Sequence, residues 1–309
     1  MKKSLQFKKF NQLTKKLKIF NPNIYIKLIP FWKKQNINYF ITAEEISKQI
    51  FYLEKKWRLK KYYSLGSYNS LCKETIQEQF FLKKTGTYRS IKEKKNNTFL
   101  YSSNKKMQIY LLGLLLTQIL WPSHYKILNF YRKKIKKKKN IKFLEIGAGH
   151  GLMSKYLIEE SQSNNGTICD ISKKSLELVK EILKKKLKLN RQIEFRRNDF
   201  FKLKISTKFD FIIMGEVVEH VTNPVKFILK AKKLLQKNGI IFLSTCANCA
   251  QVDHLYHFKS IKEIKSLIKK CKLKIISELI SPSENINKKN WKKEKIAINY
   301  CAFLKNEKN

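Results

Sequence analysis

A glycine-rich segment near the middle of the chain constrains the fold more than any other feature. The apolar run 143–146 contains Glu145, and three glycines follow it at alternate positions: Gly147, Gly149 and Gly151. The dinucleotide-binding pattern of nicotinamide and flavin enzymes needs its third glycine one position later, where this chain has Leu152. A backbone without Cβ atoms can turn sharply from a strand into a helix and lie against a bound ligand. The segment therefore predicts a strand, a tight turn and a helix, arranged either for a ligand or as an ordinary turn.

Acidic and aromatic residues follow the glycine loop at intervals that suit a nucleoside ligand. Asp170 ends the strand-like run 166–169, and Ile171 comes directly after it. An acid about 20 residues beyond such a loop can accept hydrogen bonds from ribose hydroxyls. Further along, Asp199 and Phe200 can give an adenine ring one polar partner and one aromatic edge. The run 209–215 predicts another buried strand, which Glu216 follows.

In this order and at this spacing, the motifs resemble those of class I methyltransferases that use S-adenosylmethionine (SAM). The resemblance is to the small-molecule type, including the ubiquinone-biosynthesis-like branch, and it spans residues 140–305. It implies an enzyme, a methyltransferase, with SAM as its cofactor. It also implies the residues that bind SAM: Glu145, Gly147, Gly149, Gly151, Asp170, Ile171, Asp199, Phe200 and Glu216.

Strand and helix patterns alternate from residue 141 to the end of the chain. The predicted strands are 141–147, 166–170, 192–198, 209–215, 240–244, 274–280 and 296–304. Alternation calls for a parallel sheet with helices on both faces. The last two strands have no helix between them, which resembles the antiparallel hairpin typical of class I methyltransferases. The predicted fold class is therefore α/β, a Rossmann-like seven-stranded sheet, mostly parallel with an antiparallel last strand. One of its helices is expected to begin at Asn223 and Pro224 and to end at Gly239.

Residues 1–135 have no glycine loop of this kind and predict helices. Thr42 and Glu45 form a capping-box signature before apolar residues at helical spacing. A buried helix is expected over 106–121, after which Ser123 would cap another that runs into the lysine-rich stretch 133–140. We expect residues 1–135 to form a helical lid over the substrate and residues 136–309 to form the SAM-dependent methyltransferase domain.

The segment Glu216-x-x-Glu219-His220 follows the fourth predicted strand. Methyl transfer to a hydroxyl requires that the acceptor is aligned and that its proton is removed, so such residues belong beyond the strand ends. Three interpretations are open. Glu216 could line the cofactor pocket while Glu219 and His220 order the next helix. His220 could instead be a general base, or the three side chains could bind Mg, Mn or Zn.

The same segment resembles the metal-binding motif of ubiquinone-pathway O-methyltransferases and of small-RNA 3′-end methyltransferases. The latter add a later histidine, a role that His254 or His257 would take here. The candidate catalytic residues are therefore His220, Glu219, His254 and His257. We do not assign a divalent metal, although the motif is compatible with one.

A second cluster of chemically active residues follows the fifth predicted strand. Cys246 and Cys249 precede His254 and His257, with the spacing C-x2-C-x4-H-x2-H. This pattern lacks the long spacer of a zinc finger. A structural zinc site, a plain surface loop and an acceptor loop all remain open. In the last case Asp253, His254, Tyr256 and His257 would line the pocket.

The chain carries a formal net charge of +44, which would ordinarily suggest a nucleic-acid or anionic membrane partner. Lysine accounts for nearly all of this charge and is scattered along the chain, whereas readers of nucleic acids favour arginine. We therefore attribute the charge to compositional bias and expect a small-molecule methyl acceptor, with no specific nucleic acid. The alternatives are an RNA methyltransferase acting with a Glu- and His-bound divalent metal, and a methyltransferase-fold subunit without activity.

The chain also lacks the signals of secretion and membrane insertion. The basic N-terminal stretch has no continuous apolar core, and the apolar run 109–121 is too short to span a bilayer. The six cysteines show no secreted disulfide spacing and predict free thiols. A cytoplasmic location without a membrane span is the expectation.

Overall fold

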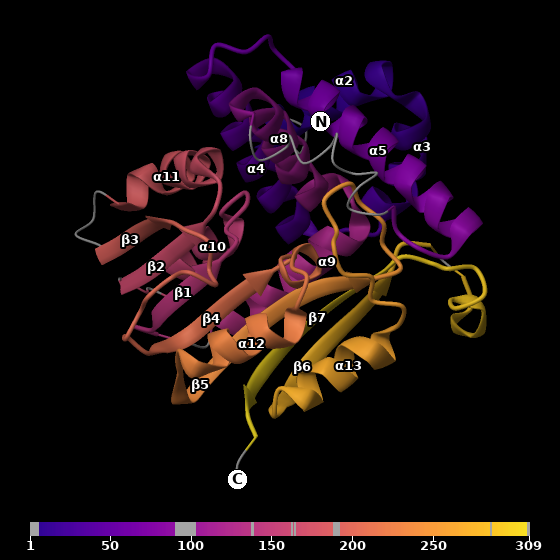
Figure 1. Ribbon diagram of the computed structural model, residues 1–309. Coiled ribbons are helices and arrows are strands. Elements are labelled where there is room, and N and C mark those ends of the chain that lie inside the picture. The colour runs from indigo at the N-terminus through magenta and orange to yellow at the C-terminus, as the bar shows by residue number, and fades with distance from the viewer. Residues whose placement is uncertain are drawn as a thin grey trace.

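Seven of the described strands form one sheet in the C-terminal part of the molecule, as the computed structural model in Figure 1 shows. The structure describes residues 6–89, 103–136, 139–161, 163, 165–187, 192–284 and 286–307. The strands are β1 (Lys142–Ile146), β2 (Asn165–Asp170), β3 (Gln192–Arg197), β4 (Phe209–Gly215), β5 (Leu235–Ala247), β6 (Leu273–Pro282) and β7 (Ile298–Asn306).

Their order across the sheet is β3-β2-β1-β4-β5-β7-β6. The first five strands run parallel, and β7 runs antiparallel to both of its neighbours, β5 and β6. This confirms the predicted α/β, Rossmann-like sheet that is mostly parallel with an antiparallel last strand. The order reverses next to β1, and ligands of open α/β sheets bind at such a switch point, beyond the carboxyl ends of the strands.

Helices cover both faces of this sheet. Successive side chains of a strand point to opposite faces, so apolar residues of the strands lie on both faces and need covering. In β4, Phe211 and Ile213 enter one core, while Ile212 and Met214 enter the other. The first core also contains apolar residues of α9 (Pro122–Ile135), α10 (Leu152–Glu160) and α11 (Lys173–Leu187). The second contains apolar residues of α12 (Pro224–Lys233) and α13 (Ile261–Lys270). The result is a three-layer arrangement with the sheet in the middle (Figure 1).

The N-terminal helices share the first of these cores. They are α2 (Lys8–Phe20), α3 (Pro22–Lys33), α4 (Ile37–Lys56), α5 (Tyr63–Thr85) and α8 (Asn104–Leu120). Helix α8 is buried along most of its length, and Leu111, Leu115 and Leu116 join the same cluster as Phe143 of the sheet. In Figure 1 this helical group lies at the carboxyl ends of the parallel strands. No helix among the described residues has the length and apolar character needed to cross a membrane.

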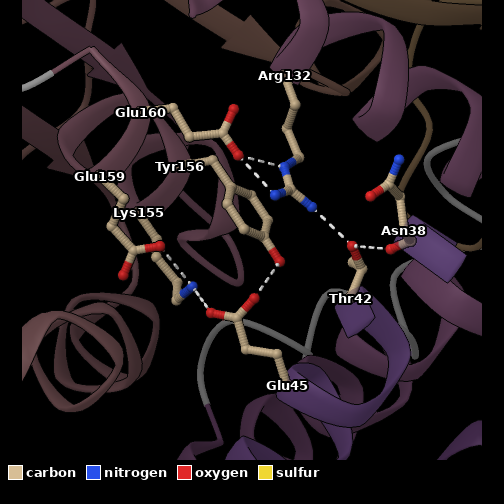
Figure 2. Close-up of polar contacts among 8 residues, drawn as sticks. All are labelled: Asn38, Thr42, Glu45, Arg132, Lys155, Tyr156, Glu159 and Glu160. Carbon is tan, nitrogen blue, oxygen red and sulfur yellow. Dashed lines mark hydrogen bonds and ion pairs between the residues drawn. The ribbon is translucent and has the colours of Figure 1, made fainter. Parts of the chain in front are cut away.

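A partly buried polar network also joins α4 to α9 and α10, two of the helices that cover the sheet (Figure 2). Arg132 of α9 donates hydrogen bonds to Glu160 of α10 at 2.6 Å and to Thr42 of α4 at 2.7 Å. Lys155 of α10 forms an ion pair with Glu45 of α4. Partly buried ion pairs that share several hydrogen bonds hold elements in one relative position. The network therefore fixes α4 against the pair α9 and α10.

The predicted capping box at Thr42 and Glu45 is wrong. Helix α4 begins earlier, where Asn36 accepts a hydrogen bond from the backbone N–H of Asn38. Thr42 and Glu45 instead lie inside the helix and contact α9 and α10. Local spacing in the sequence cannot reveal such tertiary contacts.

Two other predicted helix boundaries are also wrong. Ser123 is not an N-cap, because α9 begins at Pro122 with Trp121 as its N-cap. Gly239 does not end a helix, because α12 stops at Lys233 and Gly239 lies inside β5. The lysine-rich stretch is helical as far as residue 135, and residues 137–138 within it lie outside the described part of the chain.

Candidate functional site

A cavity of about 470 Å³ lies at the carboxyl ends of β1, β2, β4 and β5. This volume lies within the usual range for small-molecule sites. Its lining combines the glycine loop, the ends of these strands and residues of α5, α8 and α9: Leu71, Met107, Tyr110, Leu114, Gln118, Trp121, His124 and Ile127. A polar end supplied by the sheet thus faces a largely apolar wall supplied by the N-terminal helices.

The glycines of the loop have two different reasons to be there. Gly149 has φ +50°, and a Cβ atom built on it would meet only Leu114, at 3.7 Å. Gly151 has φ +72°, and its Cβ would lie 2.7 Å from the side chain of Val179. A Cβ on Gly147 would similarly lie 2.7 Å from Val217. Gly147 and Gly151 therefore allow close packing within the protein, whereas Gly149 leaves space that belongs to the cavity.

Asp170 fixes the conformation of this loop. Its Oδ2 accepts a hydrogen bond from the backbone N–H of Gly149 at 3.1 Å, and its Oδ1 accepts one from Ser172 at 2.7 Å. Burial raises the pKa of the Asp170 carboxyl, and these backbone N–H groups act in the opposite direction. Asp170 also lines the cavity, so the same carboxylate can hold the loop and face a ligand.

Glu145 lies beneath the loop at the end of β1. It is 2% exposed, lines the cavity and accepts a hydrogen bond from the hydroxyl of Ser154. Burial raises the pKa of the Glu145 carboxyl to about 8, with a smaller contribution in the same direction from Asp170. The hydrogen bond from Ser154 opposes this shift. The burial of the Glu145 carboxyl therefore favours its protonated form at neutral pH.

The predicted adenine-binding residues lie at the β2 and β3 end of the cavity. Asp199 accepts a hydrogen bond from the backbone N–H of Phe201 at 2.8 Å. Phe200 lines the cavity but packs with Phe227, at 5.0 Å between ring centroids. Ile171 and Phe201 also line the cavity and are 51% and 41% exposed. The residues that present open apolar surface here are thus Ile171 and Phe201, the second of which sequence analysis missed.

Two buried carboxyl groups form the polar end of the cavity after β4. Glu219 is 1% exposed, and its Oε2 accepts a hydrogen bond from Thr245 at 2.8 Å. Among the described residues, Oε1 of Glu216 and Oε1 of Glu219 are buried without a hydrogen-bond partner of ordinary geometry. Burial, followed by the charge of Glu216, raises the pKa of the Glu219 carboxyl well above its ordinary value. Burial also raises the pKa of Glu216.

His220 and His254 lie beside these carboxyl groups, with their rings edge to face at 4.8 Å. Nδ1 of His220 lies 3.1 Å from the carbonyl oxygen of Asp253, and Nδ1 of His254 lies 2.7 Å from that of Cys249. A carbonyl can only accept, so each neutral ring carries its proton on Nδ1 and its lone pair on Nε2. Both residues line the cavity.

His257 and Tyr256 lie elsewhere. Nε2 of His257 is 3.0 Å from Oδ1 of Asn248, and its ring stacks on Tyr88 at 4.2 Å. Tyr256 donates a hydrogen bond to Glu263. Neither residue is part of the cavity lining. The structure therefore brings Glu219, His220 and His254 together but places the fourth candidate catalytic residue, His257, outside the cavity.

Potential metal ligands also group differently from the cysteine and histidine pattern. Within the described ranges, two groups place their ligand atoms within 4.8 Å of one another. They are Glu219 with Cys246 and His254, and His220 with Asp253 and His254. Neither group contains the full set of two cysteines and two histidines that the spacing suggested.

Much of the chain is similar to known methyltransferases. A family model described as a methyltransferase domain matches residues 137–299. A ubiquinone biosynthesis O-methyltransferase of Pelagibacter ubique is 42% identical over 115 residues, which are 37% of this chain and 45% of that protein. One from Glaesserella parasuis is 28% identical over 191 residues, covering 53% of this chain and 78% of that protein. The chain spans less than half the length of the first curated relatives that it matches.

Solved structures with similar folds are more distant in sequence. An S-adenosylmethionine-dependent methyltransferase from Clostridium acetobutylicum is 12% identical with a TM-score of 0.48, covering 66% of this chain and 99% of that chain. The N-methyltransferase NodS from Bradyrhizobium japonicum, in complex with S-adenosyl-L-homocysteine, is 15% identical with a TM-score of 0.46. That similarity covers 60% of this chain and 89% of that chain.

Proposed function

Because the chain belongs to the methyltransferase domain family, we propose that it transfers a methyl group from SAM to a small-molecule acceptor. One observation carries this proposal. The glycine loop, Asp170 and the apolar wall of α8 and α9 all line a single cavity, so a cofactor and an acceptor can meet there. The RNA alternative has no support in the comparisons. We place the protein in the cytoplasm, because its six cysteines are free thiols, which persist in reducing compartments.

The cofactor takes the end of the cavity formed by the glycine loop and the ends of β2 and β3. Asp170 lies at the end of β2, where a carboxylate can accept hydrogen bonds from ribose hydroxyls. Ile171 and Phe201 offer apolar surface to the adenine, and Asp199 offers it a polar neighbour. Gly149 allows the close approach of the methionyl part, because nothing but Leu114 lies within 4 Å of its missing Cβ.

The acceptor lies between this end and the N-terminal helices. We propose that residues 1–135 act as a lid over the methyltransferase domain 136–309, because α5, α8 and α9 supply the apolar wall of the cavity. Such a wall excludes water and holds the acceptor in line with the methyl group. The acceptor oxygen attacks the methyl carbon, and the sulfur leaves with the bonding electron pair. Nε2 of His220 accepts the hydroxyl proton, since its Nδ1–H faces the Asp253 carbonyl.

A divalent cation would fit one of the two groups whose ligand atoms lie within 4.8 Å of one another, Glu219 with Cys246 and His254 or His220 with Asp253 and His254. Glu216 belongs to neither group, so Glu216, Glu219 and His220 do not form one set of ligands. Carboxylates and imidazole are common ligands of Mg, Mn and Zn. A bound ion would act as a Lewis acid toward the acceptor oxygen.

Transfer of a labelled methyl group tests the proposed function. The full chain is incubated with methyl-labelled SAM and, separately, with a panel of hydroxylated aromatic and aliphatic acceptors and with total RNA at physiological salt. We expect the label in an organic-extractable small molecule and not in RNA. Label recovered in RNA alone would contradict the proposal and support an RNA methyltransferase.

Paired glycine variants test the assignment of the loop. Asparagine tolerates the left-handed backbone conformation better than other residues with side chains, so Gly149→Asn should fold and fill the space meant for SAM. We expect at least a tenfold loss of SAM affinity with little change in melting temperature. Gly151→Asn should instead lower the melting temperature, because its Cβ meets Val179 at 2.7 Å. Calorimetry and thermal unfolding measure both, and equal SAM affinity in Gly149→Asn and wild type would count against the assignment.

SAM binding should release protons at neutral pH. SAM carries a sulfonium and an ammonium group, and a cation in the cavity lowers the pKa of Glu145 from about 8. The bound state then holds fewer protons, so affinity should rise as pH increases through the range 6–8. Calorimetric titrations in buffers of different ionisation enthalpy measure the number released. Glu145→Gln should release fewer protons, and heats that do not depend on the buffer in the wild type would contradict this expectation.

A further inference from the structure

Two histidines that sequence analysis did not single out lie at the boundary between the lid and the glycine loop. His124 belongs to the first turn of α9, and His150 lies between Gly149 and Gly151. Both line the cavity. Burial lowers the pKa of His150 to about 3. Leu114 of α8 links the two residues: its side chain would lie 3.7 Å from a Cβ on Gly149, next to His150, and its carbonyl oxygen accepts from Thr117, the partner of His124. They come from the two parts of the chain that the proposed function assigns to acceptor and cofactor.

The hydrogen bonds of Thr117 fix the tautomer of His124. The Thr117 hydroxyl donates its only proton to the carbonyl oxygen of Leu114 at 2.7 Å, because a carbonyl can only accept. Nδ1 of His124 lies 2.8 Å from the same hydroxyl oxygen. That oxygen must therefore accept a hydrogen bond from Nδ1–H of His124. The neutral ring consequently carries its lone pair on Nε2. The amide nitrogen of Gln118 lies 3.4 Å from the same Nδ1, and with the proton on Nδ1 this long contact is not a hydrogen bond.

His150 has the opposite tautomer, which its hydrogen bond with Leu152 fixes. The backbone N–H of Leu152 donates to Nδ1 of His150 at 3.1 Å. Nδ1 is therefore the acceptor nitrogen, and the neutral ring carries its proton on Nε2. Within the described residues, the His150 ring takes part in this one hydrogen bond. His124 thus keeps an acceptor atom, and His150 a donor, that the hydrogen bonds given for the described residues do not use, and both residues line the cavity.

Both rings are neutral over the physiological range. Burial lowers the pKa of His124 to about 4, and that of His150 is lower still. Around them the wall is apolar and aromatic: Trp121 lies edge to face with His124 at 4.8 Å, and Tyr110 and Leu114 line the same region. A carboxylate would place its charge against the lone pair of His124, and an ammonium would face the N–H of His150. An uncharged hydroxyl satisfies both, because it donates and accepts.

We propose that His124 and His150 form a recognition site for one uncharged hydroxyl group of the acceptor, which donates to Nε2 of His124 and accepts from Nε2–H of His150. Thr117 is a positioning residue, because it acts through His124 by fixing its tautomer. This site lies at the boundary between the lid and the glycine loop and shares no residue with the cluster of Glu219, His220 and His254. It rests on the proposed function only in taking its ligand to be the methyl acceptor.

Binding of phenol and of its methyl ether, anisole, tests the site without any methyl transfer. Anisole keeps the oxygen that accepts from His150 but lacks the proton that His124 accepts. In the full wild-type chain, saturated with S-adenosylhomocysteine, phenol should bind about 3- to 10-fold more tightly than anisole, the value of one hydrogen bond. Ligand-observed NMR titration measures both affinities. Equal affinity of phenol and anisole in the wild type would overturn the proposal without any variant.

Two asparagine variants separate the roles of the rings. In His124→Asn the amide N–H can still reach Thr117, but the acceptor at Nε2 is lost. In His150→Asn the amide oxygen can still accept from Leu152, but the donor at Nε2 is lost. His124→Asn should weaken the binding of phenol to the affinity of anisole and leave the affinity for anisole unchanged. His150→Asn should weaken both ligands by a similar factor.

A third variant and a cofactor control complete the design. His124→Gln can present an amide oxygen near the former Nε2 position and should restore part of the preference for phenol. A preference for phenol that survives unchanged in His124→Asn would refute the site. Affinity for S-adenosylhomocysteine, measured in parallel, separates the two claims. If it is absent in the wild type the proposed function fails, whereas its presence together with equal phenol and anisole affinity defeats this inference alone.

Discussion

Asp170→Ala should weaken SAM binding by roughly 10- to 150-fold, the loss expected when a charged acceptor of hydrogen bonds is removed. The carboxylate has two functions that the variant removes together. It accepts hydrogen bonds from the backbone N–H groups of Gly149 and Ser172, which hold the loop, and it lies where the SAM ribose is expected. Calorimetric titration with SAM measures the loss.

A matched aspartate provides the control. Asp210 accepts a hydrogen bond from the backbone N–H of Lys142 at the amino end of β4 and is exposed, away from the cavity. Asp210→Ala should therefore keep the wild-type affinity for SAM. Equal SAM affinity in Asp170→Ala and wild type would show that neither the loop nor the ribose depends on this carboxylate.

His220→Ala should lower turnover by roughly 100-fold or more and leave SAM affinity nearly unchanged. The reason is that His220 lines the acceptor side of the cavity, where it accepts the proton or holds a metal. Steady-state kinetics with the acceptor found in the labelling experiment measures turnover. His257→Ala is the matched control, because His257 contacts Asn248 and Tyr88 outside the cavity, and its turnover should stay near the wild-type value.

Chelation separates the two roles of His220. If EDTA abolishes the activity of the wild type and Mg or Mn restores it, His220 acts as a metal ligand, with Asp253 and His254 as the partners whose ligand atoms lie near it. If EDTA has no effect, His220 acts as the base. Turnover of His220→Ala close to that of the wild type would contradict both roles, and Glu219 and His220 would then only order the chain after β4.

The sheet could be predicted from the sequence because its signals are local. Continuous apolar runs such as Phe211–Met214 identify buried strands, and the glycines of the loop and Asp170 come directly after such runs. Helix boundaries were harder, because the same residue types serve local and tertiary purposes. Thr42 and Glu45 have the spacing of a capping box, yet they contact Arg132 and Lys155 from the middle of α4. No local pattern distinguishes these two uses.

The cofactor side of the site was more predictable than the acceptor side, for a physical reason. The residues around the glycine loop are close together in sequence, whereas the acceptor wall unites α5, α8 and α9 with the ends of β4 and β5. His124 drew no attention because a lone histidine near a helix start has no special spacing. His150 did carry a signal, since it stands between two glycines of a loop that is expected to lie against a ligand. His254 and His257 are indistinguishable by spacing, but only His254 lines the cavity.

Calorimetric titration of the purified full chain with SAM tests the central claim most directly. We predict saturable binding of one SAM per chain, and competition by S-adenosylhomocysteine for the same site. A folded chain that shows no saturable heat with either ligand would contradict the account, because the glycine loop, Asp170 and the cavity would then have another purpose.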